Sequence, residues 1–237
     1  MVRGRTIEKF IKFNIIVTCM PCFRLIQGLT AFRLYSMASI AAGRPPSLSS
    51  TAVTKLVKKF FRFQDVDEQS VKQFPSYDDR NFYFRGIPEL AVADGKGSVN
   101  QLEEYVLKLS NPLFTSYEAL EGTNALLNHL HANGFTRCIR PKVSREGADL
   151  LEITEEKLLE CDSHLKVSEK RNKSTFFMRV VSFIPGVCLD EVDKHHLTPR
   201  LLYDVGHCIG SADAILQVCV SIRPQQFNIL FLIHSLH

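Results

Sequence analysis

Acidic residues are almost absent from both ends of this chain of 237 residues. Residues 1–59 contain ten lysines and arginines but only one acid, Glu8, and no acid follows Asp213. Residues 60–237 are mildly acidic, with 19 basic against 24 acidic side chains. A basic stripe of the kind that binds nucleic acid is therefore missing from the body of the chain, and we expect no nucleic-acid partner.

Long apolar runs are scarce as well. The apolar stretch at residues 13–20 is far too short to cross a bilayer, so we expect no membrane span. The basic, acid-poor start is typical of a mitochondrial presequence. Alternatively, translation begins at Met37, where "MASIAAGRPPSLSS" leads into a helix. The second interpretation predicts a cytoplasmic protein, which we expect, with the mitochondrion as the alternative.

The cysteines lack the pairing of a disulfide framework. Their number is odd and their spacing irregular, which favours reduced thiols. Cys19 and Cys22 have the spacing of a redox motif, but no βαβ pattern surrounds them and no second pair completes a zinc site. We therefore expect neither a redox nor a metal site among the seven cysteines, which are Cys19, Cys22, Cys138, Cys161, Cys188, Cys208 and Cys219.

The middle of the chain predicts an α+β fold. Its order is three strands, a helix, two strands, a break and a second helix, which differs from the alternation of a doubly wound sheet. It is the order of a kinase-like small lobe. The predicted elements are a helix at 51–61 capped by Ser50, strands at 71–74, 80–86 and 104–110 with a hairpin turn at 93–98, a helix from Ser116 to Ala132 stopped by Gly134, strands at 142–144 and 175–183, and a helix opened by Thr198 and Pro199.

One strand contains an unexpected charge. In "EYVLKLS", Tyr105, Leu107 and Leu109 alternate onto one face, which places Lys108 on the other. A lysine on the solvent face of a half-buried strand is common. A lysine directed at a phosphate has the same pattern, so the strand alone leaves both interpretations open.

Four segments carry a resemblance to a known family. They are "FPSYDDRNFYFRG" at 74–86, "EYVLKLSN" at 104–111, "EGTNALLNHLHANGF" at 121–135 and "FFMRVVSFIPG" at 176–186. In collinear order over residues 51–217, they resemble the aminoglycoside-phosphotransferase-type kinases. Within that family the chain is most similar to the members that phosphorylate the hydroxyl of 5-hydroxy-L-lysine. The resemblance implies a GTP- or ATP-dependent phosphotransferase with Mg²⁺ and a small-molecule alcohol acceptor.

The resemblance also implies roles for particular residues. Lys108 matches the third-strand lysine that holds nucleotide phosphates, and Glu121 matches the helix carboxylate that pairs with it. The loop from Ser76 to Asp79 stands where such kinases cover the phosphates, and residues 182–184 stand where the base meets the hinge. The implied nucleotide-binding residues are Ser76, Tyr77, Asn81, Lys108, Glu121, Ser182 and Ile184.

The motifs that carry out phosphoryl transfer in this family are missing from these residues. The family's catalytic "HGD" loop and "DFG"-like metal motif have no counterpart here, and the resemblance ends near Gln217. We expect a basic, disordered segment at 1–45, a nucleotide-binding lobe at 46–186, the start of a helical lobe at 187–217 and a divergent apolar tail at 218–237. A truncated chain of this kind would bind Mg²⁺–nucleotide weakly or not at all and would not turn over substrate. The alternative is a non-catalytic lobe that binds nucleotide or a partner.

Overall fold

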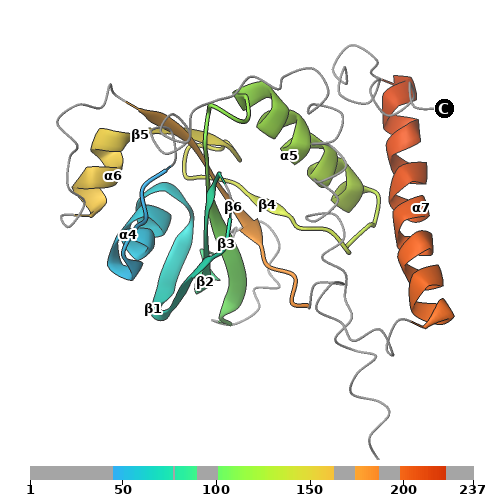
Figure 1. Cartoon of the computed structure of the whole chain (residues 1–237), viewed down its shortest axis with the longest axis horizontal. Coiled ribbons are helices and arrows are strands. Elements are labelled where there is room, and N and C mark those ends of the chain that lie inside the picture. Colours follow the sequence, from blue (N-terminus) through green and yellow to red (C-terminus); the bar gives the residue numbers. More distant parts are fainter. Residues whose placement is uncertain (1–44, 77, 90–100, 163–173, 187–197, 223–237) are drawn as a thin grey trace, which may run out of the picture. The chain divides into compact units, whose positions relative to one another are not determined.

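The computed structural model describes residues 45–76, 78–89, 101–162, 174–186 and 198–222 (Figure 1). These residues form a six-stranded antiparallel sheet and four helices, so the predicted α+β class is confirmed. The strand order is β1-β2-β3-β6-β4, and β5 also pairs with β6. The elements are α4 (Ser50–Phe60), β1 (Phe63–Phe74), β2 (Arg80–Pro88), β3 (Glu103–Ser110), α5 (Tyr117–Ala132), β4 (Pro141–Lys142), β5 (Leu151–Thr154), α6 (Glu155–Cys161), β6 (Thr175–Ser182) and α7 (Pro199–Ile222).

The chain divides into two compact units. Of the described residues, those within 45–124 and 140–183 form one unit, which holds the sheet, and those within 125–139 and 184–222 form the other. Among the helices that the structure describes, none combines the length and the hydropathy of a membrane span. The predicted hairpin turn at 93–98 lies outside the described residues.

Helix α4 covers one face of the sheet, which we call the first face. The helix starts because the side chain of Ser49 accepts a hydrogen bond from the N–H of Ala52, at 3.2 Å. The prediction named Ser50 as the cap; the cap is one residue earlier, since Ser49 has the extended backbone that this position requires. The buried side of the helix consists of Ala52, Val53, Leu56 and Val57.

Alternate strand residues complete the core beneath α4. Phe84, Tyr105 and Leu107 are fully buried there, as the alternation in the sequence predicts. The ring of Phe63 meets those of Phe84 and Tyr105 edge to face, with centroids 5.4 and 4.9 Å apart. Such pairs add to the stability that burial of apolar surface supplies. The second face of the sheet consequently carries the intervening residues, including Lys108.

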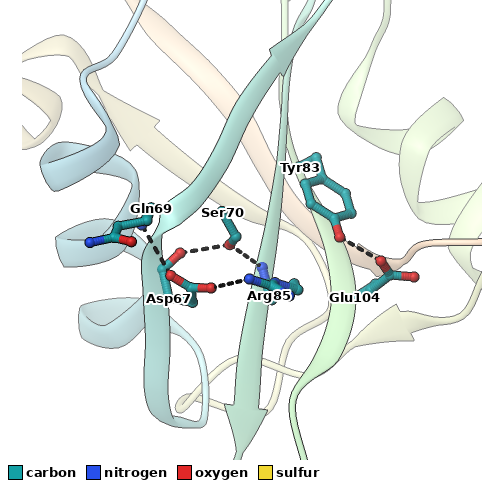
Figure 2. A network of polar contacts seen from close by, with 6 residues as sticks. All are labelled: Asp67, Gln69, Ser70, Tyr83, Arg85 and Glu104. Atoms are coloured by element: carbon teal, nitrogen blue, oxygen red, sulfur yellow. Dashed lines mark hydrogen bonds and ion pairs between the residues drawn. The ribbon is translucent and has the colours of Figure 1, made fainter.

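The prediction placed the start of β1 too late, at residue 71, because a bulge interrupts the alternation of side chains along the strand. The pairing register with β2 shifts between Asp67 and Lys72, so polar residues there do not alternate. Figure 2 shows the side chains that replace the missing ladder bonds. The Ser70 hydroxyl accepts from the N–H of Arg85 at 2.8 Å and donates to the Asp67 carbonyl at 2.6 Å. Arg85 also forms an ion pair with Asp67, at 2.5 Å.

Strand β5 and helix α6 were not predicted, because they lie within a charged and weakly periodic stretch. Both elements are short, with four and seven residues, so neither completes a recognisable period. Thr154 ends β5 and caps α6 by accepting from the N–H of Lys157 at 3.4 Å. Leu158 and Cys161 bury one side of α6.

The other unit contains the second half of α5 and helix α7. Its core includes Leu127 and Leu130 from α5 and Cys208 and Ala212 from α7. Thr198 caps α7 by accepting from the N–H of Leu201 at 3.1 Å, as predicted. Helix α7 continues to Ile222, beyond the point where the predicted tail begins, and residues 223–237 lie outside the described residues.

The predicted end of α5 is also confirmed. Gly134 has a φ of 81°, the left-handed conformation that favours glycine after a helix. The thiols of Cys138, Cys161 and Cys208 are free, whereas residues 19, 22 and 188 lie outside the described residues.

Candidate functional site

Three polar side chains form a row across the second face of the sheet. Asn81 of β2 is in register with Lys108 of β3, and Lys108 is in register with Arg179 of β6. Side chains directly opposite each other in an antiparallel pair have Cβ atoms about 5 Å apart. The pairing therefore puts two cations side by side, and we call these three residues the cationic row.

Lys108 is half-buried at the centre of this row. Burial lowers its pKa to about 8 from the usual 10.5; the neighbouring charge of Arg179 adds to the effect, and Asp79 opposes it. The described residues supply no hydrogen bond or ion pair to its ammonium group. A cation that is partly desolvated and unpaired is expensive for the fold, so the site is suited to an anionic ligand.

Glu121, the predicted partner of Lys108, is exposed on α5 and forms no ion pair with it in this structure. Leu120, Asn124 and Leu127 recur at helical spacing on the buried side of α5, which leaves Glu121 outside it. Pairing of Glu121 with Lys108 in the presence of a nucleotide stays a prediction.

Asn124 makes the polar contact between α5 and the sheet. Its amide oxygen accepts from Nη1 of Arg179 at 2.8 Å, and its Nδ2 donates to the carbonyl and Oδ1 of Asp149 at 3.0 and 3.1 Å. Asn124 is 1% exposed and Arg179 is 5% exposed, so this network is inside the protein. Neither residue was predicted to be part of the site. The signal that could have indicated Arg179 is a lone charge within the apolar strand "TFFMRVVS".

The loop between β1 and β2 is tied to the end of β3. Oδ1 of Asp79 accepts from the N–H of Asn111 at 3.1 Å, and Oδ2 accepts from the hydroxyl of Ser110 at 3.3 Å. This carboxylate is therefore engaged by protein donors, which explains how an acid can stand in a loop predicted to cover phosphates. Ser76 is half-buried in the same loop, and Tyr77 lies outside the described residues.

Ser182 joins the end of β6 to the segment before β4. Its hydroxyl accepts from the N–H of Arg140 at 2.8 Å, and its own N–H donates to the Arg140 carbonyl at 2.9 Å. The next N–H, from Phe183, donates to the carbonyl of Glu104 at 2.9 Å. Ile184, the other residue predicted near the base, is half-buried and belongs to the other compact unit.

An aromatic cluster of Phe74, Tyr83 and Phe183, which was not predicted from the sequence, lies in the sheet unit. The centroids of Tyr83 and Phe183 are 5.1 Å apart, and Phe74 is within 5.9 Å of both. The Tyr83 hydroxyl donates to Glu104 at 2.5 Å (Figure 2); burial, with help from this carboxylate, raises the pKa of Tyr83 to about 12. Phe74 is in register with Asn81, so aromatic surface adjoins the cationic row.

Unsatisfied polar atoms concentrate at the same place. Among the described residues, four buried side-chain nitrogen or oxygen atoms have no hydrogen-bond partner. Asn81 Oδ1 and Arg179 Nε belong to the cationic row, and Asn111 Nδ2 follows the end of β3, whereas Thr54 Oγ1 is on α4. Buried polar groups are usually paired, so this concentration marks the row as a place for a polar ligand.

A metal site is a poor fit to these residues. The part of the chain that the structure describes holds no group of three or more His, Cys, Asp or Glu that could bind a metal ion. The unpaired groups at the row include an ammonium and a guanidinium nitrogen, which are donors and repel a cation. The row accordingly fits an anion and not Mg²⁺ itself.

An antiparallel sheet with a lysine on its third strand, followed by a helix that packs on the sheet, is the architecture of the small lobe of kinase-like proteins. No protein-family model matches the chain. Sequence comparison nevertheless finds curated relatives that carry one name, hydroxylysine kinase.

The relative from Xenopus laevis is 27% identical over 172 residues, which cover 72% of this chain and 39% of the relative. That from Danio rerio is 26% identical over 173 residues, covering 72% and 39%, and that from Mus musculus is 27% identical over 177 residues, covering 74% and 40%. The resemblance to hydroxylysine kinases is confirmed. The chain spans about two fifths of the length of these relatives.

Proposed function

We propose that the sheet unit binds the phosphates of a nucleotide, GTP or ATP, as the nucleotide-binding lobe of a phosphotransferase that acts on the hydroxyl of 5-hydroxy-L-lysine. The observation that carries the proposal is the unpaired, half-buried ammonium of Lys108 between two residues with unpaired buried polar atoms. The names of the curated relatives support the reaction and the acceptor.

Each part of the site has a task in this proposal. The ammonium of Lys108 donates to phosphate oxygens, and its cost to the fold falls when an anion neutralises it. The cluster of Phe74, Tyr83 and Phe183 offers apolar surface beside the row for the base. Asp79 holds the β1–β2 loop against the end of β3, so that backbone N–H groups of the loop stand over the phosphates.

Magnesium would arrive bound to the nucleotide; the described residues hold no group of three or more His, Cys, Asp or Glu that could bind it. The chain also contains no "HGD" or "DFG" string to orient an attacking hydroxyl or to fix a metal. Phosphoryl transfer depends on both. We therefore propose that these 237 residues bind nucleotide weakly and do not turn over 5-hydroxy-L-lysine by themselves.

Equilibrium dialysis of the full chain against Mg²⁺–ATP and Mg²⁺–GTP tests the proposal. We expect saturable binding of at least one nucleotide and a loss of roughly tenfold or more in affinity for Lys108→Ala, because a charge-assisted hydrogen bond contributes about 1.5–3 kcal/mol. Lys72→Ala, at an exposed lysine of β1, is the matched control and should bind like the wild type.

Two results would contradict the proposal. Binding of neither nucleotide by the wild type removes its basis, and equal affinities for the wild type and Lys108→Ala remove the role of the lysine. The same samples, supplied with 5-hydroxy-L-lysine and assayed for nucleoside diphosphate release, should show no turnover.

A further inference from the structure

A buried arginine without an anionic partner is the feature that the proposed function leaves unexplained. Arg179 is 5% exposed, yet no carboxylate of the described residues forms an ion pair with it. A guanidinium cannot shed its charge as a lysine can, because its pKa is too high. A buried, permanent charge of this kind calls for a counter-charge.

The two carboxylates that attract Arg179, those of Asp79 and Asp149, are hydrogen-bonded to other residues. Asp79 and Asp149 act on Arg179 only through the longer-range attraction of their charges. Asp79 accepts instead from Asn111 and Ser110, and Asp149 accepts from Asn124. Lys108, in register on the next strand, adds a second positive charge on the same face.

The guanidinium is oriented but only partly satisfied. Nη1 donates to Asn124, which is itself fixed by two hydrogen bonds to Asp149, while Nε is buried without a partner. An arginine that served only to hold α5 on the sheet could do so with a neutral donor. The positioned charge and the spare donor therefore remain to be explained by a ligand.

We propose that Arg179 is a second phosphate-binding cation, which acts with Lys108 on the polyphosphate chain of the nucleotide. The inference rests on the proposed function and adds a residue to its site. Two cations in register bind adjacent phosphate groups better than one flexible lysine, because the guanidinium is already held in place by Asn124. A bound phosphate would compensate the charges of Lys108 and Arg179 together.

The test uses the full chain and inorganic tripolyphosphate, with its affinity measured by calorimetry without a nucleotide base. Arg179→Met keeps an unbranched apolar stem in place of the guanidinium and removes the charge, and Arg179→Lys keeps the charge. Arg85→Met is the matched control, since Arg85 lies on the same face of the same sheet but is paired with Asp67. We expect a loss of roughly tenfold or more for Arg179→Met, a smaller loss for Arg179→Lys and less than about a twofold change for Arg85→Met.

Parallel measurements with Mg²⁺–ATP, Mg²⁺–GTP and Lys108→Ala separate this inference from the proposed function. If Lys108→Ala loses nucleotide binding and Arg179→Met does not, the inference is wrong and the function stands. If tripolyphosphate binding depends on Arg179 but neither nucleotide binds, the anion site stands and the nucleotide function fails. If the wild type does not bind tripolyphosphate, the inference is also wrong.

A readout on the wild type covers the case in which Arg179→Met fails to fold. The Nε–H resonance of Arg179, assigned by sequential connectivity in the labelled chain, should shift when tripolyphosphate is added. If Arg179 has only a structural role, its Nε–H resonance should stay unchanged at saturating tripolyphosphate, and that result would contradict the inference.

Discussion

Replacement of Lys108 by methionine should stabilise the folded chain at neutral pH. The lysine has a pKa of about 8 when folded and the usual 10.5 when unfolded, a gap of about 2.5 pKa units. Each unit corresponds to about 1.4 kcal/mol, so the charge of Lys108 destabilises the fold by about 3 kcal/mol at neutral pH. Methionine preserves the aliphatic stem without the charge.

The pH dependence distinguishes this electrostatic effect from a change in packing. Between about pH 8 and 10.5 the unfolded chain holds a proton on Lys108 that the folded chain has lost, so the free energy of unfolding rises with pH across that window. The advantage of Lys108→Met should therefore fall from about 3 kcal/mol at pH 7 to about 1 kcal/mol at pH 10. Urea unfolding of both proteins at the two pH values measures it.

Lys72→Met is the control, because Lys72 is exposed on a strand of the same sheet. It should change the free energy of unfolding by less than about 0.5 kcal/mol at either pH. A Lys108→Met chain that is less stable than the wild type at neutral pH, or an advantage that stays constant with pH, would refute the reasoning about the buried charge.

Three further changes test the framework around the site, each by urea unfolding. Gly86→Ala should destabilise the chain by about 1–3 kcal/mol, since its Cβ would lie 2.9 Å from a ring carbon of Phe63 and 3.1 Å from the Asp65 carbonyl. Gly206→Ala is the control and should be neutral or slightly stabilising, because the space around Gly206 is open. Equal changes in the free energy of unfolding for the two variants would contradict this. Asp79→Ala should lower the free energy of unfolding by about 1–3 kcal/mol, because it leaves the buried N–H of Asn111 unpaired. Asp79→Asn should recover part of that loss. Full stability of the alanine variant would show that this contact does not hold the loop. Ser49→Ala should cost about 1 kcal/mol through loss of the α4 cap, and an equal loss for Ser50→Ala would contradict the assignment of Ser49.

Strong local signals made much of the fold predictable. Thr198 and Gly134 bound helices as expected, because a capping hydroxyl and a left-handed glycine act through their own backbone. The alternation in β3 placed Tyr105 in the core and Lys108 on the opposite face. Where a bulge interrupts the period, as in β1 after Asp67, or an element is as short as β5, local pattern gives no such signal.

The candidate site was harder to predict than the strands that carry it. Lys108 drew attention because a charge interrupts an apolar strand, and Arg179 in β6 carries the same signal. Their adjacency depends on the pairing of β3 with β6, strands that are separated by about seventy residues of sequence, so no local pattern contains it. The buried role of Asn124 likewise depends on which side of α5 packs on the sheet, and the resemblance directed attention to Glu121 instead.

The pKa of Lys108 with and without bound nucleotide tests the central claim most directly. Heteronuclear NMR of the lysine side chain, recorded over a pH series, should give a pKa of about 8 for the free chain. Saturation with Mg²⁺–ATP or Mg²⁺–GTP should raise that pKa toward or above 10.5, because the phosphates stabilise the charged ammonium. A pKa of Lys108 that stays unchanged at saturating nucleotide would contradict a phosphate-binding role for the cationic row.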